Sequence, residues 1–333
     1  MARTSTTHLR PCDDRATWDA YVNTHGGHPL QLWGWGQTKA AHGWHAIRLL
    51  AYDGDEAIGG AQVLTRHLPW PLRALSYVPR GPVGAADRAG AVLDAVAAYA
   101  HSHEHAVTLT IEPDWSTVPQ LSGDWRRSDN TILIPQTLVL DLRLPEDRLL
   151  AAMSKKTRQY IRKSGREPDL AIRPVTDRSA LGDCLEIYRE TAARAHFALH
   201  SDDYYRDVFD DLGERSAVFA AYAKQQPVAF LWEATSATTA FELYGGMTDL
   251  GARLRANYAL KWHAIRAMRA RGVQRYDVNG LVSDGVSTFK RGFADHEDLL
   301  VGTFDKPLSP LYAVWDKGLP LAKQVVRRGR PGR

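Results

Sequence analysis

The stretch AYAKQQPVAFL (221–231) decides the fold, because a stretch of similar organisation, AYDGDEAIGGA (51–61), stands in the first half of the chain. Each contains two strand-like runs separated by a short polar turn, so each predicts a β-hairpin. The two hairpins occupy equivalent places in two similar halves. A repeated architecture of this kind predicts two related domains, and a chain of 333 residues is long enough for two.

Around each hairpin, periodicity and turn residues predict one shared order: a helix, three antiparallel strands, a loop, a second helix and a final strand. In the first half these elements are 15–24, 46–52, 57–66, 72–78, 79–84, 87–103 and 106–112. In the second half they are 178–194, 217–223, 228–234, 239–245, 247–257, 258–271 and 273–278. Gly272 stands where a helix commonly ends, and a further strand linking the halves is expected over 131–142.

One mixed sheet per half, with a loop leading into a helix N-terminus after the third strand, is the layout of the GNAT acyltransferase fold. We therefore predict an α/β protein with two tandem GNAT-like domains, each a mixed, mainly antiparallel sheet flanked by helices. The expected bounds are 1–150 for the first domain, 151–172 for a basic inter-domain helix and 173–285 for the second domain. The segment 286–333 is expected to pack back on the first domain and to end in a basic tail.

Composition excludes several classes of protein. The chain is 44% hydrophobic and 24% charged, which excludes wholesale disorder, and it has no apolar run near the ~18 residues of a membrane span. Residues 1–15 are polar and carry no secretion signal. The two cysteines exclude a disulfide scaffold and a cysteine-based zinc site. These features predict a reduced, cytoplasmic protein without a transmembrane segment.

The net charge of +4 is unevenly distributed. Residues 154–166 contain six bases and no acid, and six more bases without an acid follow from Lys317 to the end. Such clusters attract RNA, nucleotides or anionic lipid. The alternative is a solvated helix face and a frayed tail.

Neither loop that would hold an acyl carrier has the glycine pattern that binds the pyrophosphate of coenzyme A. PRGPVGAADRAG (79–90) has prolines where backbone N–H groups are needed, and MTDLGARLRAN (247–257) has one glycine. The layout therefore indicates acyl transfer, whereas the loops argue against coenzyme A. We expect no cofactor.

The order and spacing of seven motifs resemble the Fem-type aminoacyl-tRNA-dependent transferases, which build peptidoglycan interpeptide bridges. The motifs are LQLWGWGQTK (30–39), YVPRGPV (77–83), TIEPDW (110–115), MSKKTRQYIRKSGRE (153–167), RANYALKWHAIRAMRARGVQRYDVNG (255–280), FKRGF (289–293) and VGTFDKPLSPLY (301–312). The resemblance runs from about Leu30 to Ala313. Members of this family have two GNAT-like domains, and larger ones insert a helical arm in the second. Residues 173–279 leave no room for an arm, so the chain resembles the compact members.

The resemblance implies an enzyme that takes an amino acid from aminoacyl-tRNA, where it is held as an ester. It would form an amide with an amino group of a peptidoglycan precursor stem peptide carried on UDP or on a lipid, with the first domain on the acceptor side. Such an enzyme has to align two large anionic substrates, help to remove a proton from the amine and stabilise the oxyanion. DNA is not an expected partner, and contact with a membrane surface is compatible with this interpretation.

Two residues are candidates for catalysis. Lys290 matches the family's Phe-Lys pair, which implies a lysine near the transferred carbonyl and the tRNA end; the alternative is a surface lysine beside Arg291. Asp114 follows a predicted strand, and the resemblance implies a general base or an orienting group for the amine. The alternative is ordinary turn chemistry at Pro113-Asp114.

Acceptor binding is expected at the positions that match the family's binding residues, where tyrosines would stack on a uracil or sugar face and lysines would contact phosphate. These positions are Lys39, Tyr204, Tyr258, Phe289 and Lys290. At His200 the family usually has arginine, and a histidine cannot offer the same permanent phosphate fork. Either Arg194 or Arg206 compensates, or the acceptor is not the usual nucleotide-linked precursor.

Two further anion-binding features are predicted. Arg80 in the PRGPV motif is a candidate, with a structural loop arginine as the alternative. With charged tRNA as donor, the basic helix is expected to track the acceptor stem. Its candidate residues are Lys155, Lys156, Arg158 and Arg162.

Three other features have the composition of a site. HSHEH (101–105) could bind a metal but lies at a predicted helix end, Cys184 is expected to be a core residue rather than a nucleophile, and LWGWGQ (32–37) is either a ligand wall or a core edge. No metal site is predicted. Three other functions stay open: tRNA-dependent aminoacylation of a peptide or nucleoside antibiotic, acyl-coenzyme A N-acyl transfer, and a non-enzymatic RNA-binding or cell-wall-associated role.

Overall fold

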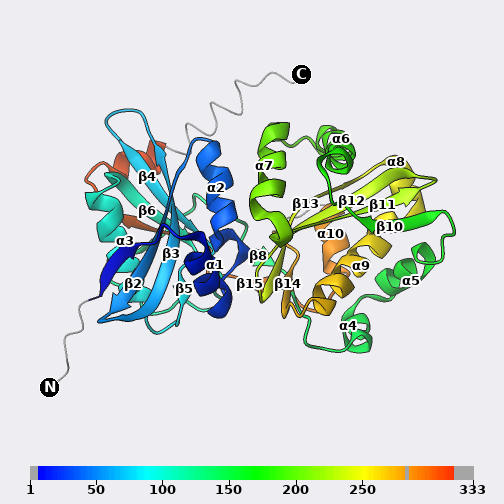
Figure 1. Cartoon of the computed structure of the whole chain (residues 1–333), viewed down its shortest axis with the longest axis horizontal. Coiled ribbons are helices and arrows are strands. Elements are labelled where there is room, and N and C mark those ends of the chain that lie inside the picture. The colour runs from blue at the N-terminus through cyan, green and yellow to red at the C-terminus, as the bar shows by residue number, and fades with distance from the viewer. Residues whose placement is uncertain (1–6, 282–284, 319–333) are drawn as a thin grey trace. The chain divides into compact units, whose positions relative to one another are not determined.

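The computed structural model describes residues 7–281 and 285–318, which form two compact units (Figure 1). The first unit ends at Pro135 and resumes at Leu299, and the second comprises Gln136–Asp298. The basic tail predicted beyond Lys317 lies almost wholly outside the described residues. Among the described helices, none combines the length and the apolar character that crossing a bilayer requires.

The first unit is built on one mixed sheet with the strand order β1-β2-β3-β4-β6-β16-β7, and β5 pairs with β3. Its pairs are antiparallel except β4 with β6, which is parallel. Its elements are β1 (His8–Pro11), α1 (Arg15–Thr24), the 3₁₀ turn η1 (Pro29–Gln31), α2 (Trp33–Ala41), β2 (His45–Asp53), β3 (Glu56–His67), β4 (Ala74–Pro79), β5 (Val83–Gly84), α3 (Ala89–Ser102), β6 (Ala106–Glu112), β7 (Arg126–Arg127) and β16 (Phe304–Pro307).

The second unit has a sheet of order β10-β11-β12-β13-β14-β9, in which only β13 and β14 are parallel. Its elements are β9 (Val139–Asp141), α4 (Glu146–Ala152), α5 (Lys155–Ser164), β10 (Leu170–Pro174), α6 (Arg178–Ala195), α7 (Asp202–Leu212), η2 (Gly213–Arg215), β11 (Ser216–Ala223), β12 (Gln226–Thr235), β13 (Thr239–Met247), α8 (Asp249–Leu254), α9 (Ala256–Ala270), β14 (Arg275–Asp277) and α10 (Gly285–Arg291). A short ladder pairs β8 (Gln136–Thr137) with β15 (Asp298–Leu299).

The predicted repeat is confirmed, and it extends to detail. In each unit three antiparallel strands are followed by a helix and by a strand parallel to the third. Both predicted hairpins form, and each carries a register shift at the same Ala-Tyr pair, between Ala51 and Tyr52 and between Ala221 and Tyr222. A shift at equivalent positions shows that the two hairpins share their irregularity as well as their pairing.

Successive side chains of β12 point to opposite faces of the second sheet, and helices pack on both faces (Figure 1). Ala229 and Leu231 belong to the buried cluster that includes α9, whereas Phe230 and Trp232 contact the rings of Tyr188 on α6 and Phe209 on α7. Because the side chains on both faces are buried, residues 228–232 of β12 are all apolar and do not alternate between apolar and polar. The first unit has its own core between α3 and its sheet.

Three local expectations were wrong. The segment 247–257 contains a helix, α8, because the side chain of Thr248 accepts a hydrogen bond from the Gly251 N–H and caps it. The strand expected over 131–142 forms only as the short strands β8 and β9. The strand expected from Leu72 starts at Ala74, because Pro69–Leu72 forms the turn before it.

Two predicted linking segments can be placed by their contacts. The basic segment 151–172, expected between the domains, lies in the second unit with α4 and α5. The chain returns to the first unit at Leu299, where β16 pairs antiparallel with β6, so residues 286–298 also lie in the second unit.

Gly251 offers a test of the packing under α8. A Cβ there would stand 2.2 Å from the Val228 carbonyl oxygen, which is backbone and cannot move aside cheaply. Gly251→Ala is expected to lower the free energy of unfolding by about 1–3 kcal/mol in urea titrations. The matched control is Gly182→Ala in α6, where the Cβ meets nothing within 4 Å and the helix propensity of alanine should raise stability by about 0.5–1 kcal/mol. Equal effects would contradict this account.

Candidate functional site

In the first unit, the candidate residues Arg80 and Asp114 follow the carboxyl ends of the parallel strands β4 and β6. The Arg80 N–H donates to the Glu112 carbonyl at 2.8 Å, which brings the two motifs together. Gln31 joins them to the first motif, since its amide donates to the Pro79 carbonyl at 2.6 Å. Three motifs that are far apart in sequence therefore meet at one end of this strand pair.

Arg80 is 3% exposed and has a positive φ of 54°. One of its guanidinium nitrogens, Nη2, lies 3.5 Å from the Ile134 carbonyl oxygen. The guanidinium is thus buried within the unit. This burial favours the alternative interpretation of Arg80 as a structural loop arginine. Asp114 is half-buried at the turn after β6.

Glu112, which sequence reasoning did not select, is the most highly coordinated carboxylate of this end of the sheet. It is 1% exposed, and it accepts from the Tyr77 hydroxyl at 2.5 Å, the Thr303 hydroxyl at 2.8 Å and the N–H groups of Ile132 and Leu133 at 2.6 and 2.9 Å. Burial, and next the nearby Glu112 charge, raise the pKa of Tyr77 well above its ordinary value. An acid at the end of an otherwise apolar strand was the available signal.

Lys39 lies on α2 with its ammonium 4.5 Å from the centre of the Trp35 ring. Burial, and next the positive charge of Arg66, lower the pKa of Lys39 to about 8. Trp35 is buried and Trp33 stacks under the Arg48 guanidinium at 3.9 Å, so LWGWGQ forms a core edge that also holds cations. Lys39 is therefore a desolvated amine on an aromatic surface.

In the second unit, the parallel strands β13 and β14 stop pairing after Phe241 and Asp277, while β13 continues beside β12 to Met247. Asn279 stands at this divergence with a φ of 56°. Its side-chain amide donates to the Glu242 carbonyl at 3.0 Å, and its own N–H donates to an Asp277 carboxylate oxygen at 2.8 Å. Asn279 thereby supplies a hydrogen-bond donor to the Glu242 carbonyl of β13, with which β14 no longer pairs.

The Lys290 side chain, on α10, also lies at this divergence of β13 and β14. Its ammonium donates to the carbonyl oxygens of Asn279 and Gly280, at 2.5 and 3.3 Å. These two carbonyl oxygens fix the orientation of the Lys290 side chain. The half-buried side chain is therefore held at the carboxyl end of β14 and does not extend into solvent.

The motif around Lys290 packs on the start of α5. Gly292 leaves no space for a side chain, because a Cβ there would stand 2.3 Å from the Thr157 hydroxyl. The Ser154 N–H donates to the Gly292 carbonyl at 3.0 Å, and the Ser154 hydroxyl caps α5. The glycine of FKRGF thus permits the close approach of MSKKT.

Aromatic rings complete this contact. Tyr258 of α9 packs edge-to-face on Phe289 at 4.9 Å and on Tyr160 of α5 at 5.0 Å between ring centres. The Arg255 guanidinium lies 4.5 Å from the Tyr160 ring. The structure therefore brings the predicted residues Tyr258, Phe289 and Lys290 together with the basic helix α5.

The basic helix divides into two parts by role. Lys155, Lys156 and Arg162 are exposed, whereas Arg158 is half-buried and donates to the carbonyls of Leu150 and Ala151 at 3.4 and 3.2 Å. These are carbonyls of the last turn of α4, so Arg158 acts as a side-chain cap for that helix. The exposed bases remain candidates for binding a polyanion.

Beneath Lys290 lies a buried polar network that sequence reasoning missed. Lys261 of α9 contacts both oxygens of Glu242 at 2.8 and 3.0 Å, and the Tyr276 hydroxyl lies 2.8 Å from Glu242 and 2.6 Å from Glu233. All four side chains are below 7% exposed. Acids in the apolar contexts of β12 and β13 were the sequence signal.

The protons of this network can be assigned from its charges. Burial raises the pKa of Glu233 to about 8, the largest cause of its shift. A neutral Glu233 donates to the phenol oxygen of Tyr276, whose single proton then goes to Glu242, and Lys261 neutralises Glu242. One positive and one negative charge remain, which is the balance that a buried site requires.

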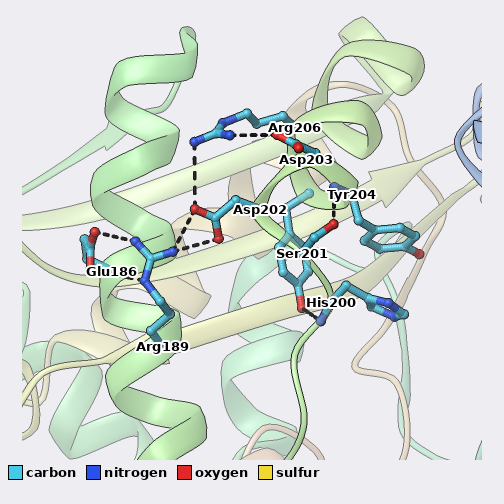
Figure 2. Close-up of polar contacts among 9 residues, drawn as sticks. Glu186, Arg189, His200, Ser201, Asp202, Asp203, Tyr204 and Arg206 are labelled. Atoms are coloured by element: carbon cyan, nitrogen blue, oxygen red, sulfur yellow. Dashed lines mark hydrogen bonds and ion pairs between the residues drawn. The ribbon is translucent and has the colours of Figure 1, made fainter. Parts of the chain in front are cut away.

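His200 and Tyr204 form a stacked pair at the start of α7, with ring centres 4.0 Å apart (Figure 2). Tyr204 is 3% exposed, and burial raises its pKa to about 12. The exposed His200 ring thus covers the tyrosine that was expected to offer a stacking face.

Arg194 and Arg206, one of which was expected to compensate for His200 unless the acceptor differs, both contact carboxylates. Arg206 contacts Asp203 at 2.9 Å, and Arg194 contacts Asp249 at 3.4 Å and also donates to the Met247 carbonyl at 2.6 Å. Arg189 pairs with Asp202 at 2.7 Å (Figure 2). This region therefore holds its arginines in ion pairs.

Two further sequence features have structural roles. Cys184 is fully buried in α6, and burial raises the pKa of its thiol to about 12, which opposes a nucleophilic role. In HSHEH, Glu104 pairs with His45 at 3.0 Å. Across residues 7–281 and 285–318, no group of three or more His, Cys, Asp or Glu side chains is placed to hold a metal ion.

Both repeated parts of the chain are similar to known protein families. Residues 14–136 match the model of the FemAB family, and residues 151–291 match that of an acetyltransferase (GNAT) domain. The first repeated part of the chain is therefore similar to the FemAB family, and the second is similar to a GNAT acetyltransferase domain. Each match covers one of the two repeated parts, so the predicted tandem GNAT-like fold is confirmed.

Individual relatives show the same similarity. This chain is 26% identical to a lipid II:glycine glycyltransferase of Staphylococcus aureus, over 59% of this chain and 50% of that protein, so it spans about half the length of such relatives. The crystal structure of FemX superposes with a TM-score of 0.82 at 18% identity, covering 93% of this chain and 100% of that one. A tandem GNAT protein from the clavulanic acid pathway gives a TM-score of 0.51 at 12% identity, covering 91% and 99%. At these identities the structural matches establish the fold.

The proton on Glu233 can be tested through stability. Because its folded-state pKa of about 8 lies above the ordinary 4.5, the folded chain binds more protons than the unfolded chain between these values, and stability falls as pH rises through that window. Glu233→Gln mimics the neutral acid and removes this term. Urea titrations across the window should show wild type losing stability relative to the variant, by up to about 1.4 kcal/mol per pH unit. The control is the exposed Glu214→Gln, and parallel curves for wild type and Glu233→Gln would contradict a neutral Glu233.

Proposed function

We propose that this chain is a member of the FemAB family and an aminoacyl-tRNA-dependent aminoacyltransferase that forms an amide on an amino group of a peptidoglycan precursor stem peptide. The observation that carries the proposal is the position of Lys290. Its ammonium is held by two backbone carbonyls at the carboxyl end of a parallel strand pair, which is the edge where α/β sheets commonly bind ligands. The FemAB match and the similarity to the glycyltransferase support the reaction class.

The reaction needs alignment and charge stabilisation more than a protein nucleophile. The acceptor amine attacks the ester carbonyl of the aminoacyl group, the bond to the ribose oxygen breaks, and the amine proton is finally carried by that oxygen. We assign to Lys290 the stabilisation of the oxyanion formed during attack, since a fixed ammonium lowers the energy of that charge. Asp114 remains the candidate for orienting the amine or accepting its proton.

The donor is expected to bind along α5. Lys155, Lys156 and Arg162 are exposed bases on the helix whose first turn packs against the Lys290 motif. A tRNA acceptor stem on this helix would place its aminoacylated end toward α10. Coenzyme A is a weaker candidate, because α8 occupies most of the segment that would have to form a phosphate-binding loop.

For the acceptor, we propose a muramyl peptide, with the desolvated Lys39 of the first unit as its candidate contact. The His200–Tyr204 pair of the second unit stays a separate predicted binding feature. The arginines near His200 contact carboxylates, so a nucleotide phosphate bound here would have to compete with these ion pairs. A peptide or nucleoside antibiotic acceptor is the second candidate, favoured by the same observation. Incubation with charged tRNAs and both acceptor classes, followed by mass measurement, distinguishes them.

Lys290→Ala tests the catalytic assignment. Loss of one preorganised oxyanion donor is expected to lower kcat by about 10²–10³-fold in a tRNA-dependent transfer assay. The matched control is Arg291→Ala, which removes the neighbouring positive charge and its pair with Glu297. Full activity of Lys290→Ala, with circular dichroism unchanged, would refute the role.

The α5 surface is tested by Lys155→Gln, Lys156→Gln and Arg162→Gln combined, with Arg158 kept because it caps α4. The KM for charged tRNA should rise, and the slope of log affinity against log salt should flatten by about 1 for each phosphate group that the protein no longer neutralises. The control removes three bases elsewhere in the unit, Arg143, Arg178 and Lys224. An equal change in the control would assign the effect to net charge alone.

A further inference from the structure

The hairpin that joins β3 to β4 presents an unusually exposed aromatic side chain. Trp70 is 88% exposed, the highest value for any large apolar side chain among the residues that the structure describes. Pro69 and Pro71 flank it and are exposed too. Figure 1 shows this light-blue hairpin extending past the end of the sheet. A tryptophan in water at a projecting tip is costly unless a partner covers it.

The tip is a defined turn rather than a loose loop. The Leu68 N–H donates to the Arg73 carbonyl at 2.7 Å, and the Leu72 N–H donates to the Pro69 carbonyl at 3.1 Å. The strands below it pair in register up to His67 and Ala74. The fold therefore holds Trp70 outward instead of letting it fold back on the sheet.

The charged side chains of the hairpin itself have one sign. Arg66, His67 and Arg73 are exposed at its base, and the sequence contains no Asp or Glu from Ala57 to Ala86. An indole at the tip with arginines behind it is the arrangement that suits a bilayer interface, where the ring lies at headgroup depth and the cations meet anionic lipid.

The hairpin is also close to a candidate acceptor-binding residue. The Arg66 guanidinium is 5.5 Å from the Trp44 ring centre, and the Trp44 N–H donates to the Lys39 carbonyl at 3.1 Å, so the charge of Arg66 also acts on the Lys39 amine. Anything bound at the hairpin therefore lies beside the expected acceptor site of the same unit.

We propose that the segment Arg66–Arg73 is a membrane-contact hairpin that inserts Trp70 into the interface of an anionic bilayer, and hence that the acceptor is lipid-linked. The choice of carrier rests on the proposed function, whereas the membrane contact does not. A protein partner is disfavoured because one narrow hairpin offers far less surface than the ~800 Å² per partner of a stable complex.

The contact is expected to be weak and reversible by itself. One shallow aromatic anchor and two arginines provide marginal membrane affinity, and stable attachment takes a second signal. A lipid-linked acceptor in the neighbouring site supplies that second attachment. The enzyme would then reside on the membrane when it holds its acceptor and leave when the product dissociates.

Vesicle sedimentation tests the membrane contact without any assay of transfer. The full chain is spun with vesicles of phosphatidylglycerol and phosphatidylcholine, and with phosphatidylcholine alone, at low salt. Trp70→Ser should weaken binding to the anionic vesicles about tenfold, and Arg73→Gln about fivefold. Leu144→Ser, which removes another exposed apolar side chain, and Lys155→Gln with Lys156→Gln are the controls.

The membrane contact would be overturned if the wild-type chain did not bind anionic vesicles. It would also be overturned if Trp70→Ser bound them as well as the wild type and Leu144→Ser do. Binding that depends on Lys155 and Lys156 but not on Trp70 would overturn it too. Because Trp70 is so exposed, the variant should keep the wild-type melting temperature, which separates weaker binding from impaired folding.

A kinetic comparison tests the carrier. With a muramyl peptide on a vesicle-embedded polyprenyl lipid, Trp70→Ser should raise KM about tenfold at unchanged kcat, and with the same peptide on UDP it should change neither value. Equal impairment on both acceptors, or turnover of the UDP form alone, would refute a lipid-linked acceptor. Absence of transfer from any acceptor would refute the proposed function and leave the sedimentation result standing.

Discussion

In each unit two parallel strands stop pairing at their carboxyl ends, and the backbone groups released there have to be satisfied by other partners. A buried carbonyl without a hydrogen bond is costly, so the positions just past these ends are constrained. In the first unit the Arg80 N–H meets the Glu112 carbonyl, and in the second the Asn279 amide meets the Glu242 carbonyl. The candidate catalytic residues follow from this constraint, because Asp114 and Lys290 are both placed by the chain segments that leave these ends.

Around the second of these ends, packing and charge support one another. Lys261, Glu242, Tyr276 and Glu233 form a closed network under the diverging strands. Above it, the carbonyls of Asn279 and Gly280 hold Lys290. Rigid support of this kind is what a group needs if it is to stabilise charge without reorganising during the reaction. The network therefore links the stability of the unit to the geometry of its candidate site.

The two units have kept the repeated sheet and differ in what they add to it. The first carries the projecting Trp70 hairpin and the desolvated Lys39, whereas the second carries the basic helix α5 and the Lys290 motif. Under the proposed function, one sheet would be specialised for the acceptor and the other for the donor. Such a division can arise when a sheet is duplicated and each copy then acquires its own loops and helices.

Local sequence determined the repeat, both hairpins, most helices and the motifs, because hydrophobic period and turn residues act over a few positions. It also indicated Lys290, Phe289 and Tyr258, whose motifs are continuous. Only the tertiary structure showed that Arg80 is buried, that Arg158 caps α4 and that His200 covers Tyr204. The same holds for the Lys261–Glu242–Tyr276–Glu233 network, which joins one helix to three strands. Burial and hydrogen-bond partners depend on which distant segments meet, and no local pattern records that meeting.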